Sequence, residues 1–232
     1  MPDEYTRPVI RTSSECKRAT FSSEDTPYRI VVIDRTCHER RVREYIAYAE
    51  KLGIHRRPFF RGKSHWYEIR HPVDDPLAIS EITYTRYFVL SNPDHCVLNK
   101  NFYGIQAIIQ EDLLYGLLAS TLSFLFFEMN SRKPGAGASG INVSVASRLK
   151  VVDPAWIDGG LLDGILEAAR SIRSRAISDI DCEVRQPDRV QLDRLLFRAL
   201  GLDSGLVEEL YEGLLRLVTE RLARAASVEP KP

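Results

Sequence analysis

Residues 113–145, LLYGLLASTLSFLFFEMNSRKPGAGASGINVSV, decide the fold, because they join the most apolar run of the chain to a glycine-rich segment. The first 15 residues, 113–127, lie between Asp112 and Glu128 without a charge. A membrane-spanning helix needs roughly 18 or more apolar residues, so this run is too short to be one. It predicts a single helix that is buried on most of its surface.

The glycine-rich segment, residues 135–140, has the glycine spacing of a dinucleotide-binding loop. Such a loop follows a strand and opens a helix, so that its amides meet a pyrophosphate. Here the order is reversed, because the apolar helix comes first and the alternating residues 141–145 predict a strand after it. Two interpretations stay open: a flexible helix-to-strand connector, or a loop that lets backbone amides, Arg132 and Lys133 approach a phosphate or a base edge.

The composition is that of a globular protein of 232 residues, long enough for one large domain or two small ones. Lys plus Arg equals Asp plus Glu, at 32 each. The charge is nevertheless uneven: residues 1–150 carry 21 basic and 17 acidic side chains, a net +4, and residues 151–232 carry 11 and 15, a net −4. Residues 35–70 alone carry 10 basic against 4 acidic side chains, a net +6. A local excess of this kind indicates a surface for an acidic partner.

The cysteines, Cys16, Cys37, Cys96 and Cys182, are scattered without a C-x-x-C pair, which disfavours a zinc site and a disulfide framework. Free thiols of this kind are typical of a reducing cytoplasm. The N-terminus has no apolar segment of the signal-peptide type. We therefore expect a cytoplasmic protein that has no membrane partner.

The chain changes pattern along its length. The polar residues 1–26 predict a flexible lead-in, residues 28–33 a strand, and the apolar spacing within residues 39–52 a helix that Gly53 ends. Short β-like runs follow at residues 79–83, 87–90, 96–98 and 102–105, and residues 148–156 predict the last strand.

Near residue 158 the apolar period changes from two to 3.6. Two apolar stripes, at residues 192–200 and 206–218, predict helices. We therefore expect an α+β fold with a mixed or antiparallel sheet packed on the buried helix, followed by a C-terminal helical region. The expected divisions are a lead-in over 1–26, an α+β domain over 27–157 and the helical region over 158–232.

Residues 55–69, HRRPFFRGKSHWYEI, interleave cations with aromatic rings, with Pro58 and Gly62 as breaks. One interpretation is a strand whose rings pack on the core while its cations are solvated. The other is a nucleic-acid surface, with cations on phosphates and Arg forks or ring faces on bases. The two interpretations are compatible.

Three motifs occur together in this chain: the basic stretch ending in Trp66 and Tyr67, the turn NKNFYGI at residues 99–105, and LLASTLS at residues 117–123, followed by the glycine-rich segment. This set resembles the target-recognition region of N6-adenine-specific DNA methyltransferases of restriction–modification systems, including the TaqI-like C-terminal specificity domain. The resemblance extends over about residues 28–226. It implies a sequence-recognition module that binds double-stranded DNA.

Methyl transfer in that family needs an S-adenosylmethionine-binding sheet and an Asn/Asp-Pro-Pro-aromatic motif, and the sequence has neither. The nearest approach, Asn92-Pro93-Asp94-His95, lacks the second proline and the aromatic residue. The resemblance therefore implies no catalytic residue and no cofactor on this chain. S-adenosylmethionine is expected on a methyltransferase catalytic domain or subunit that this sequence does not contain.

The resemblance, together with the charge pattern, assigns DNA contacts to cations, polar side chains, rings and the glycine-rich segment. The candidates are Arg56, Arg57, Arg61, Lys63, Trp66, Tyr67, Asn99, Lys100, Asn101, Tyr103, Arg132, Lys133, Gly135, Gly137 and Ser139. The six cations other than Lys100 are expected on or near one face. Glu128 and Asp153 are interpreted as solvated charges or caps. The alternative is a methyltransferase-derived interaction or regulatory protein without DNA binding or catalysis.

Overall fold

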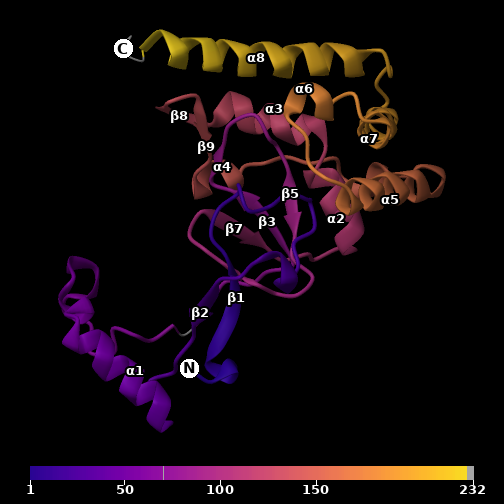
Figure 1. Ribbon diagram of the computed structural model, residues 1–232. Coiled ribbons are helices and arrows are strands. Elements are labelled where there is room, and N and C mark those ends of the chain that lie inside the picture. Colours follow the sequence, from indigo (N-terminus) through magenta and orange to yellow (C-terminus); the bar gives the residue numbers. More distant parts are fainter. Residues whose placement is uncertain (70, 229–232) are drawn as a thin grey trace.

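The computed structural model describes residues 1–69 and 71–228 and has the predicted α+β fold (Figure 1). Its strands form three small sheets among the described residues. The first has the order β2-β1-β6, from Arg29–Val31, Thr6–Ile10 and Val97–Leu98. The second, β5-β3-β7, is antiparallel and comes from Val89–Ser91, Leu77–Ser80 and Phe102–Ile105. The third, β4-β9-β8, comes from Ile82–Thr83, Ala138–Gly140 and Arg132–Gly135.

The helices flank and cover these sheets. They are α1 (Arg40–Lys51), α2 (Glu111–Leu118), α3 (Thr121–Asn130), α4 (Val143–Ala146), α5 (Gly159–Ser174), α6 (Ile180–Glu183), α7 (Pro187–Ala199) and α8 (Leu206–Val228). Short 3-10 turns lie at η1 (Asp3–Tyr5), η2 (Ser23–Asp25), η3 (Ile54–Arg56), η4 (Pro58–Phe60) and η5 (Pro154–Trp156). The predicted helices at residues 39–52, 192–200 and 206–218 are confirmed as α1, α7 and α8.

The largest core lies between the sheet of β3, β5 and β7 and the helices α2, α5 and α7. Leu77, Leu117, Ile165 and Leu192 are fully buried at its centre. A second core joins α3 to α6, α7 and α8 around Phe124. The C-terminal helical region therefore shares its apolar contacts with the α+β part, and the core is continuous across residue 158.

The prediction of one helix over residues 113–127 is wrong in one respect: the segment is buried, but it bends by 53° between α2 and α3. Ser120 has an extended backbone and caps α3 by accepting a hydrogen bond from the Ser123 amide. A helix that breaks in the core leaves backbone groups without their intrahelical partners. Two side chains of α7 supply partners: Arg189 donates to the Ala119 carbonyl, and Asp193 accepts from the Thr121 amide at 2.9 Å.

The expected flexible lead-in is also wrong. Residues 6–10 form β1, which pairs with β2 on one side and with β6 on the other. Ile10, Cys16 and Phe21 are fully buried. Their burial explains why this segment has a defined structure, because these side chains complete the third core with Leu90 of β5.

The strand predicted over residues 148–156 is wrong as well. The strand predicted over residues 141–145 is wrong too. In its place Asn142 caps the four-residue helix α4 by accepting a hydrogen bond from the Val145 amide at 2.9 Å. The chain then runs without regular structure to η5, where Asp153 accepts from the Ala155 amide at 2.9 Å and so acts as the expected cap. Alternation failed here because only Ile141 and Val145 are buried, whereas Val143 is exposed.

Among the described residues no single helix has the length and apolarity to cross a membrane. The bent pair of α2 and α3 satisfies the two criteria only when its halves are taken together.

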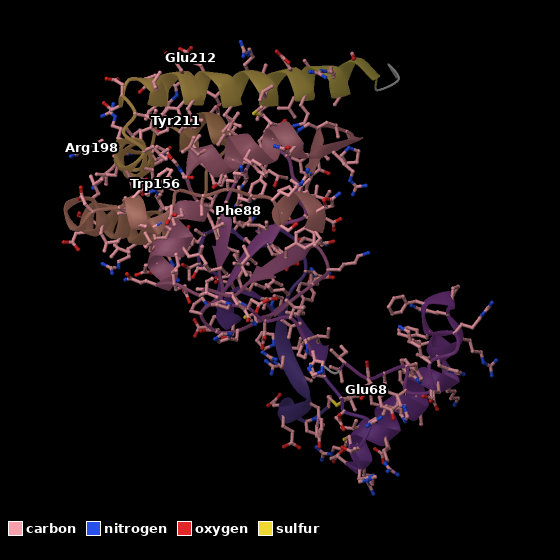
Figure 2. The ribbon with its side chains drawn as sticks, turned by 180° about the vertical axis from the view of Figure 1, so that it is seen from behind. Glu68, Phe88, Trp156, Arg198, Tyr211 and Glu212 are labelled. Atoms are coloured by element: carbon pink, nitrogen blue, oxygen red, sulfur yellow. The ribbon has the colours of Figure 1, made fainter. Side chains whose placement is uncertain are left out.

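Residues 28–69 project away from this body as an arm (Figure 1). The arm contains β2, α1, η3 and η4, and the β1–β2 pair connects it to the body. In the view from behind, Glu68 lies on the arm and Phe88 lies within the body (Figure 2). In Figure 1 the helix α8 lies at the end of the molecule opposite to the arm.

Candidate nucleic-acid interface

The arm carries the local positive charge that the sequence indicated. Residues 28–69 contain 10 basic and 5 acidic side chains, a net +5. Ile33 and, on α1, Val42 and Ala49 are buried within the arm, and Ile33 pairs with Glu68 in an isolated bridge. The arm therefore has a small core of its own that holds its basic surface in place.

The tip of the arm is not a strand, so that interpretation of residues 55–69 is wrong. Gly53 ends α1 with a positive φ of 73°, and Pro58 begins the 3-10 turn η4. Gly62 turns the chain again with a φ of 81°. Both glycines occupy the left-handed region, where a side chain would be strained. The breaks at Pro58 and Gly62 thus fold the stretch back on itself instead of extending it.

Aromatic rings hold these turns together. Phe60 packs edge-on against Phe59 and against Trp66, and Trp66 packs edge-on against Tyr67, with centroids 5.1 to 5.9 Å apart. The Trp66 indole N–H donates to Glu50 at the end of α1, over 3.1 Å. Edge-to-face pairs of this kind contribute about 0.5–1.5 kcal/mol each beyond their burial. Trp66 and Tyr67 are therefore structural parts of the tip as well as candidates for contact.

Four of the predicted DNA contacts, Arg56, Arg57, Arg61 and Lys63, are brought together at this tip, and all four are exposed. The Lys63 ammonium lies 3.9 Å from the centroid of the Phe59 ring, in a cation–π contact. Within the described chain, no carboxylate forms a salt bridge with any of the four. Unpaired cations at an exposed tip are suited to contact phosphates.

The glycine-rich segment is a tight hairpin between β8 and β9, not a helix-to-strand connector. Gly135 pairs with Ala138, so Ala136 and Gly137 form the loop, and both have positive φ, of 48° and 70°. A two-residue loop with positive φ at both positions matches the twist of a β-hairpin. At Gly137 an added Cβ would lie 3.0 Å from Leu222, so α8 packs closely on the loop.

A buried ionic network anchors the hairpin to α8. Glu128 accepts from Arg221 Nε at 2.9 Å and from Lys133 Nζ at 2.7 Å, and the Tyr87 hydroxyl also donates to it. Arg221 donates in addition to the Gly137 carbonyl. Burial alone would raise the pKa of Glu128, but the hydrogen bonds from Lys133, Tyr87 and Arg221 outweigh it and hold the pKa below its ordinary value.

This network corrects the interpretation of Glu128 as a solvated charge, because its side chain is only 2% exposed. It also gives Lys133 a structural partner. Arg132 differs from Lys133: its side chain is exposed and has no hydrogen bond or ion pair within the described parts of the chain. Ser139 is buried and its hydroxyl lies 2.6 Å from that of Ser131. Of the hairpin candidates, Arg132 is the one best placed to contact a partner.

The candidates in residues 99–103 are tied into the body. Asn99 and Asn101 both donate to the carbonyl of Arg11, at 3.3 and 2.9 Å, and so attach the N-terminal strand to β7. The Tyr103 hydroxyl donates to the Ile141 carbonyl at 3.2 Å. Lys100 is exposed. These bonds show what the polar side chains do within the fold, and their contact with DNA stays a prediction.

Six of the seven predicted cations form two groups, one at the tip of the arm and one on the β8–β9 hairpin, which Figure 1 places in different parts of the molecule. The seventh, Lys100, lies in neither group, on the turn between β6 and β7. Whether one duplex reaches both groups stays a prediction.

The sequence patterns did not single out Arg221 or Phe59. Arg221 follows Leu214 and Val218 at the i, i+4, i+7 spacing of the buried face of α8, so a cation within an apolar stripe is its local signal. Its partner Glu128 is 93 residues away and cannot be identified from that signal.

No protein-family model matches the chain, and no curated protein matches it. Among solved structures, it is similar to one reported as the crystal structure of the type IIG restriction endonuclease BpuSI. The similarity covers 97% of this chain and 27% of the endonuclease chain, with a TM-score of 0.64 and 19% sequence identity. The similarity is one of fold. This chain therefore spans about a quarter of the length of the protein that it matches.

Proposed function

We propose that the chain is the DNA sequence-recognition module of a restriction–modification enzyme, and that the enzyme is an N6-adenine-specific DNA methyltransferase. One observation carries the proposal: nearly the whole chain, 97%, has the fold of a part of a type IIG restriction endonuclease. The three sequence motifs that resemble the target-recognition region of adenine methyltransferases point to the same class.

The charge distribution supports a nucleic-acid partner. Four exposed cations stand at the tip of an arm with a net charge of +5, and Arg132 is exposed on a rigid hairpin. Phosphate contacts supply affinity without sequence information, whereas Arg forks and amides at base edges supply discrimination. The arm is thus suited to hold the backbone, and Arg132 is suited to read a base.

The catalytic half of such an enzyme is assigned to another domain or subunit, which is the second partner of the module. The glycine-rich segment of this chain does not fit S-adenosylmethionine. It is a two-residue turn between two strands, packed against α8 through the Gly137 carbonyl and Arg221, whereas a cofactor loop lies between a strand and a helix.

A second candidate is a methyltransferase-derived interaction or regulatory protein that does not bind DNA. The observation in its favour is that Asn99, Asn101 and Lys133 all have partners within the fold. Their roles in the body are sufficient to explain why these polar side chains are present.

Selection from a random duplex library separates the two candidates. The chain, alone or joined to its catalytic partner, is incubated with double-stranded oligonucleotides of random sequence, and the bound fraction is sequenced. A recognition module enriches a short common site, and Arg132→Ala relaxes the preference at one position of that site. The interaction protein enriches no sequence, and that result from the full assembly would overturn the proposal.

A further inference from the structure

The tip of the arm has two hollows, one on each side of a wall formed by Phe60, Lys63 and Trp66. The first, here named the aromatic groove, has a volume of about 690 Å³, and Tyr45, Phe59 and Tyr67 line it together with the wall. The second, named the basic hollow, has a volume of about 650 Å³, and its lining includes His55, Arg56 and Arg61. Each hollow is large enough for a small polar or aromatic group, and they share a wall.

The two hollows differ in chemistry. The aromatic groove is lined largely by apolar atoms, and the Phe59 ring at its edge is 74% exposed. The basic hollow receives three cations, Arg56, Arg61 and Lys63, against one acidic residue, Glu50, whose carboxylate already accepts the Trp66 indole N–H. The aromatic groove is lined by one acidic residue, Glu68, and by two cations, Arg29 and Lys63. The basic hollow therefore has the larger excess of cations, and the aromatic groove has the larger number of rings.

Lys63 lies between the two sides. Its ammonium is held 3.9 Å from the centroid of Phe59, and the side chain lines both hollows. A cation over a ring remains available to an anion, because the contact contributes only about 0.5–1 kcal/mol at an exposed site. A ligand with a flat apolar part and an adjacent anionic part matches this arrangement.

We infer that the tip of the arm binds an unpaired nucleotide of a single DNA strand, with the base in the aromatic groove and the flanking phosphates at the basic hollow. A base in a duplex is stacked on both faces and cannot present a face to a ring. An unpaired base can, and stacking of this kind tolerates any base because every base has a π-face. The cations on the other side of the wall follow the strand through its phosphates.

This inference refines the proposed function at the arm, and it rests on that function in assigning nucleic-acid phosphates to the arm cations. It adds a ligand that duplex recognition does not require. A strand with unpaired bases arises wherever DNA is locally opened, and the arm cations that hold duplex phosphates would hold the phosphates of such a strand as well, while its unpaired base enters the aromatic groove.

The fluorescence of Trp66 tests directly whether a single strand binds at the tip of the arm. The chain has two tryptophans, and Trp156 lies on the body, far from the arm (Figure 2). In a Trp156→Phe background, emission therefore comes from Trp66 alone, which lines both hollows. The probes are an oligothymidylate single strand and the same oligonucleotide annealed to its complement.

We expect saturable quenching of Trp66 by the single strand and weaker quenching by the duplex, whose phosphates can reach the arm cations but whose bases stay stacked on one another. Phe59→Ala and Lys63→Ala should each weaken the single-strand affinity about tenfold to 100-fold, in line with the removal of one stacked base or one neutralised phosphate. Both side chains are exposed, so neither change opens a buried core. Phe59→Ala removes one edge-on contact, with Phe60, while the Phe60–Trp66 and Trp66–Tyr67 contacts remain. The matched controls are Tyr48→Ala, an exposed ring outside both hollows, and Arg41→Ala, an exposed cation on α1.

Three outcomes would overturn the inference: no saturable binding of the single strand, equal quenching by the duplex, or equal loss of affinity in the Tyr48 and Arg41 controls. A groove that holds a protein segment instead is revealed if Phe59→Ala abolishes assembly with the catalytic partner and leaves single-strand binding unchanged. If the library selection enriches no sequence but the single strand still binds, only the proposed duplex function is overturned. The reverse result would remove only the unpaired-nucleotide site.

Discussion

Asp193 of α7 accepts two hydrogen bonds from Thr121, one from its backbone amide at 2.9 Å and one from its hydroxyl at 2.6 Å. Thr121 is the first residue of α3, where the preceding helix has just ended. The Tyr211 hydroxyl of α8 donates to the same carboxylate at 3.0 Å. One buried carboxylate thus joins three helices at the point where the central apolar segment bends.

Replacement of Asp193 by Ala should therefore destabilise the protein by about 3 kcal/mol, because it leaves a buried amide and two buried hydroxyls without their acceptor. The expected result is a lower midpoint of urea denaturation. Ser171→Ala, which removes one exposed hydrogen bond to Asp188, is the control and should change the midpoint little. An unchanged midpoint for the Asp193 variant would show that water or a shifted helix replaces the carboxylate.

Glu128 gives a prediction on pH. Its pKa is held below its ordinary value of 4.5, because the hydrogen bonds from Lys133, Tyr87 and Arg221 outweigh the opposing effect of burial. A carboxyl with a lowered folded pKa stabilises the protein above the unfolded pKa, and this contribution is lost as the pH falls through the folded pKa. The free energy of unfolding should thus decline with pH below about 4.5.

The Glu128→Gln variant tests this contribution. At neutral pH it should unfold about 3–5 kcal/mol more easily than the natural protein, since it leaves the buried Arg221 without its counter-charge. The difference between the two proteins should shrink on acidification, because the natural carboxylate is then protonated as well. Urea denaturation at several pH values measures it, and a difference that stays constant down to about pH 3 would contradict the assignment.

Helix α1 shows what the sequence can predict. The apolar spacing and Gly53 act within a few residues of one another, so the helix and its end were predicted correctly. The bend between α2 and α3 could not be predicted in the same way. Ala119 and Ser120 allow a continuous helix, and the groups that stabilise the break, Arg189 and Asp193, lie about 70 residues further along the chain.

In the candidate site, too, the features set by neighbouring residues could be predicted, and those set by distant residues could not. The exposure of Arg56, Arg57, Arg61 and Lys63 follows from their local pattern of charges, rings and breaks. The burial of Glu128 depends on Arg221 in a helix 93 residues away, and a single acidic letter after an apolar run gives no sign of it. The order of residues 6–10 likewise depends on pairing with β6, which the polar composition of the N-terminus conceals.

Arg132 and Lys133 are neighbours whose replacement should have different effects. Arg132→Ala should lower DNA affinity or relax sequence preference by about 1–3 kcal/mol and leave the melting temperature unchanged, because the side chain has no partner in the described chain. Lys133→Ala should lower the melting temperature, because its ammonium is bonded to Glu128 at 2.7 Å. Thermal denaturation and duplex binding are measured on the same two preparations. Equal effects on stability would contradict the different roles of the two cations in the hairpin.

The central claim, that the chain binds DNA through the cations of the arm, is tested most directly by duplex affinity as a function of salt concentration. The comparison is between the natural protein and a variant with Arg56, Arg57, Arg61 and Lys63 all changed to Ala. The natural protein is joined to its catalytic partner if the module alone binds weakly. The logarithm of its duplex affinity should fall linearly with the logarithm of the salt concentration. The variant should bind more weakly to every sequence, with a slope smaller by about one unit for each phosphate that is no longer neutralised. An identical affinity and slope for the two proteins would contradict the claim.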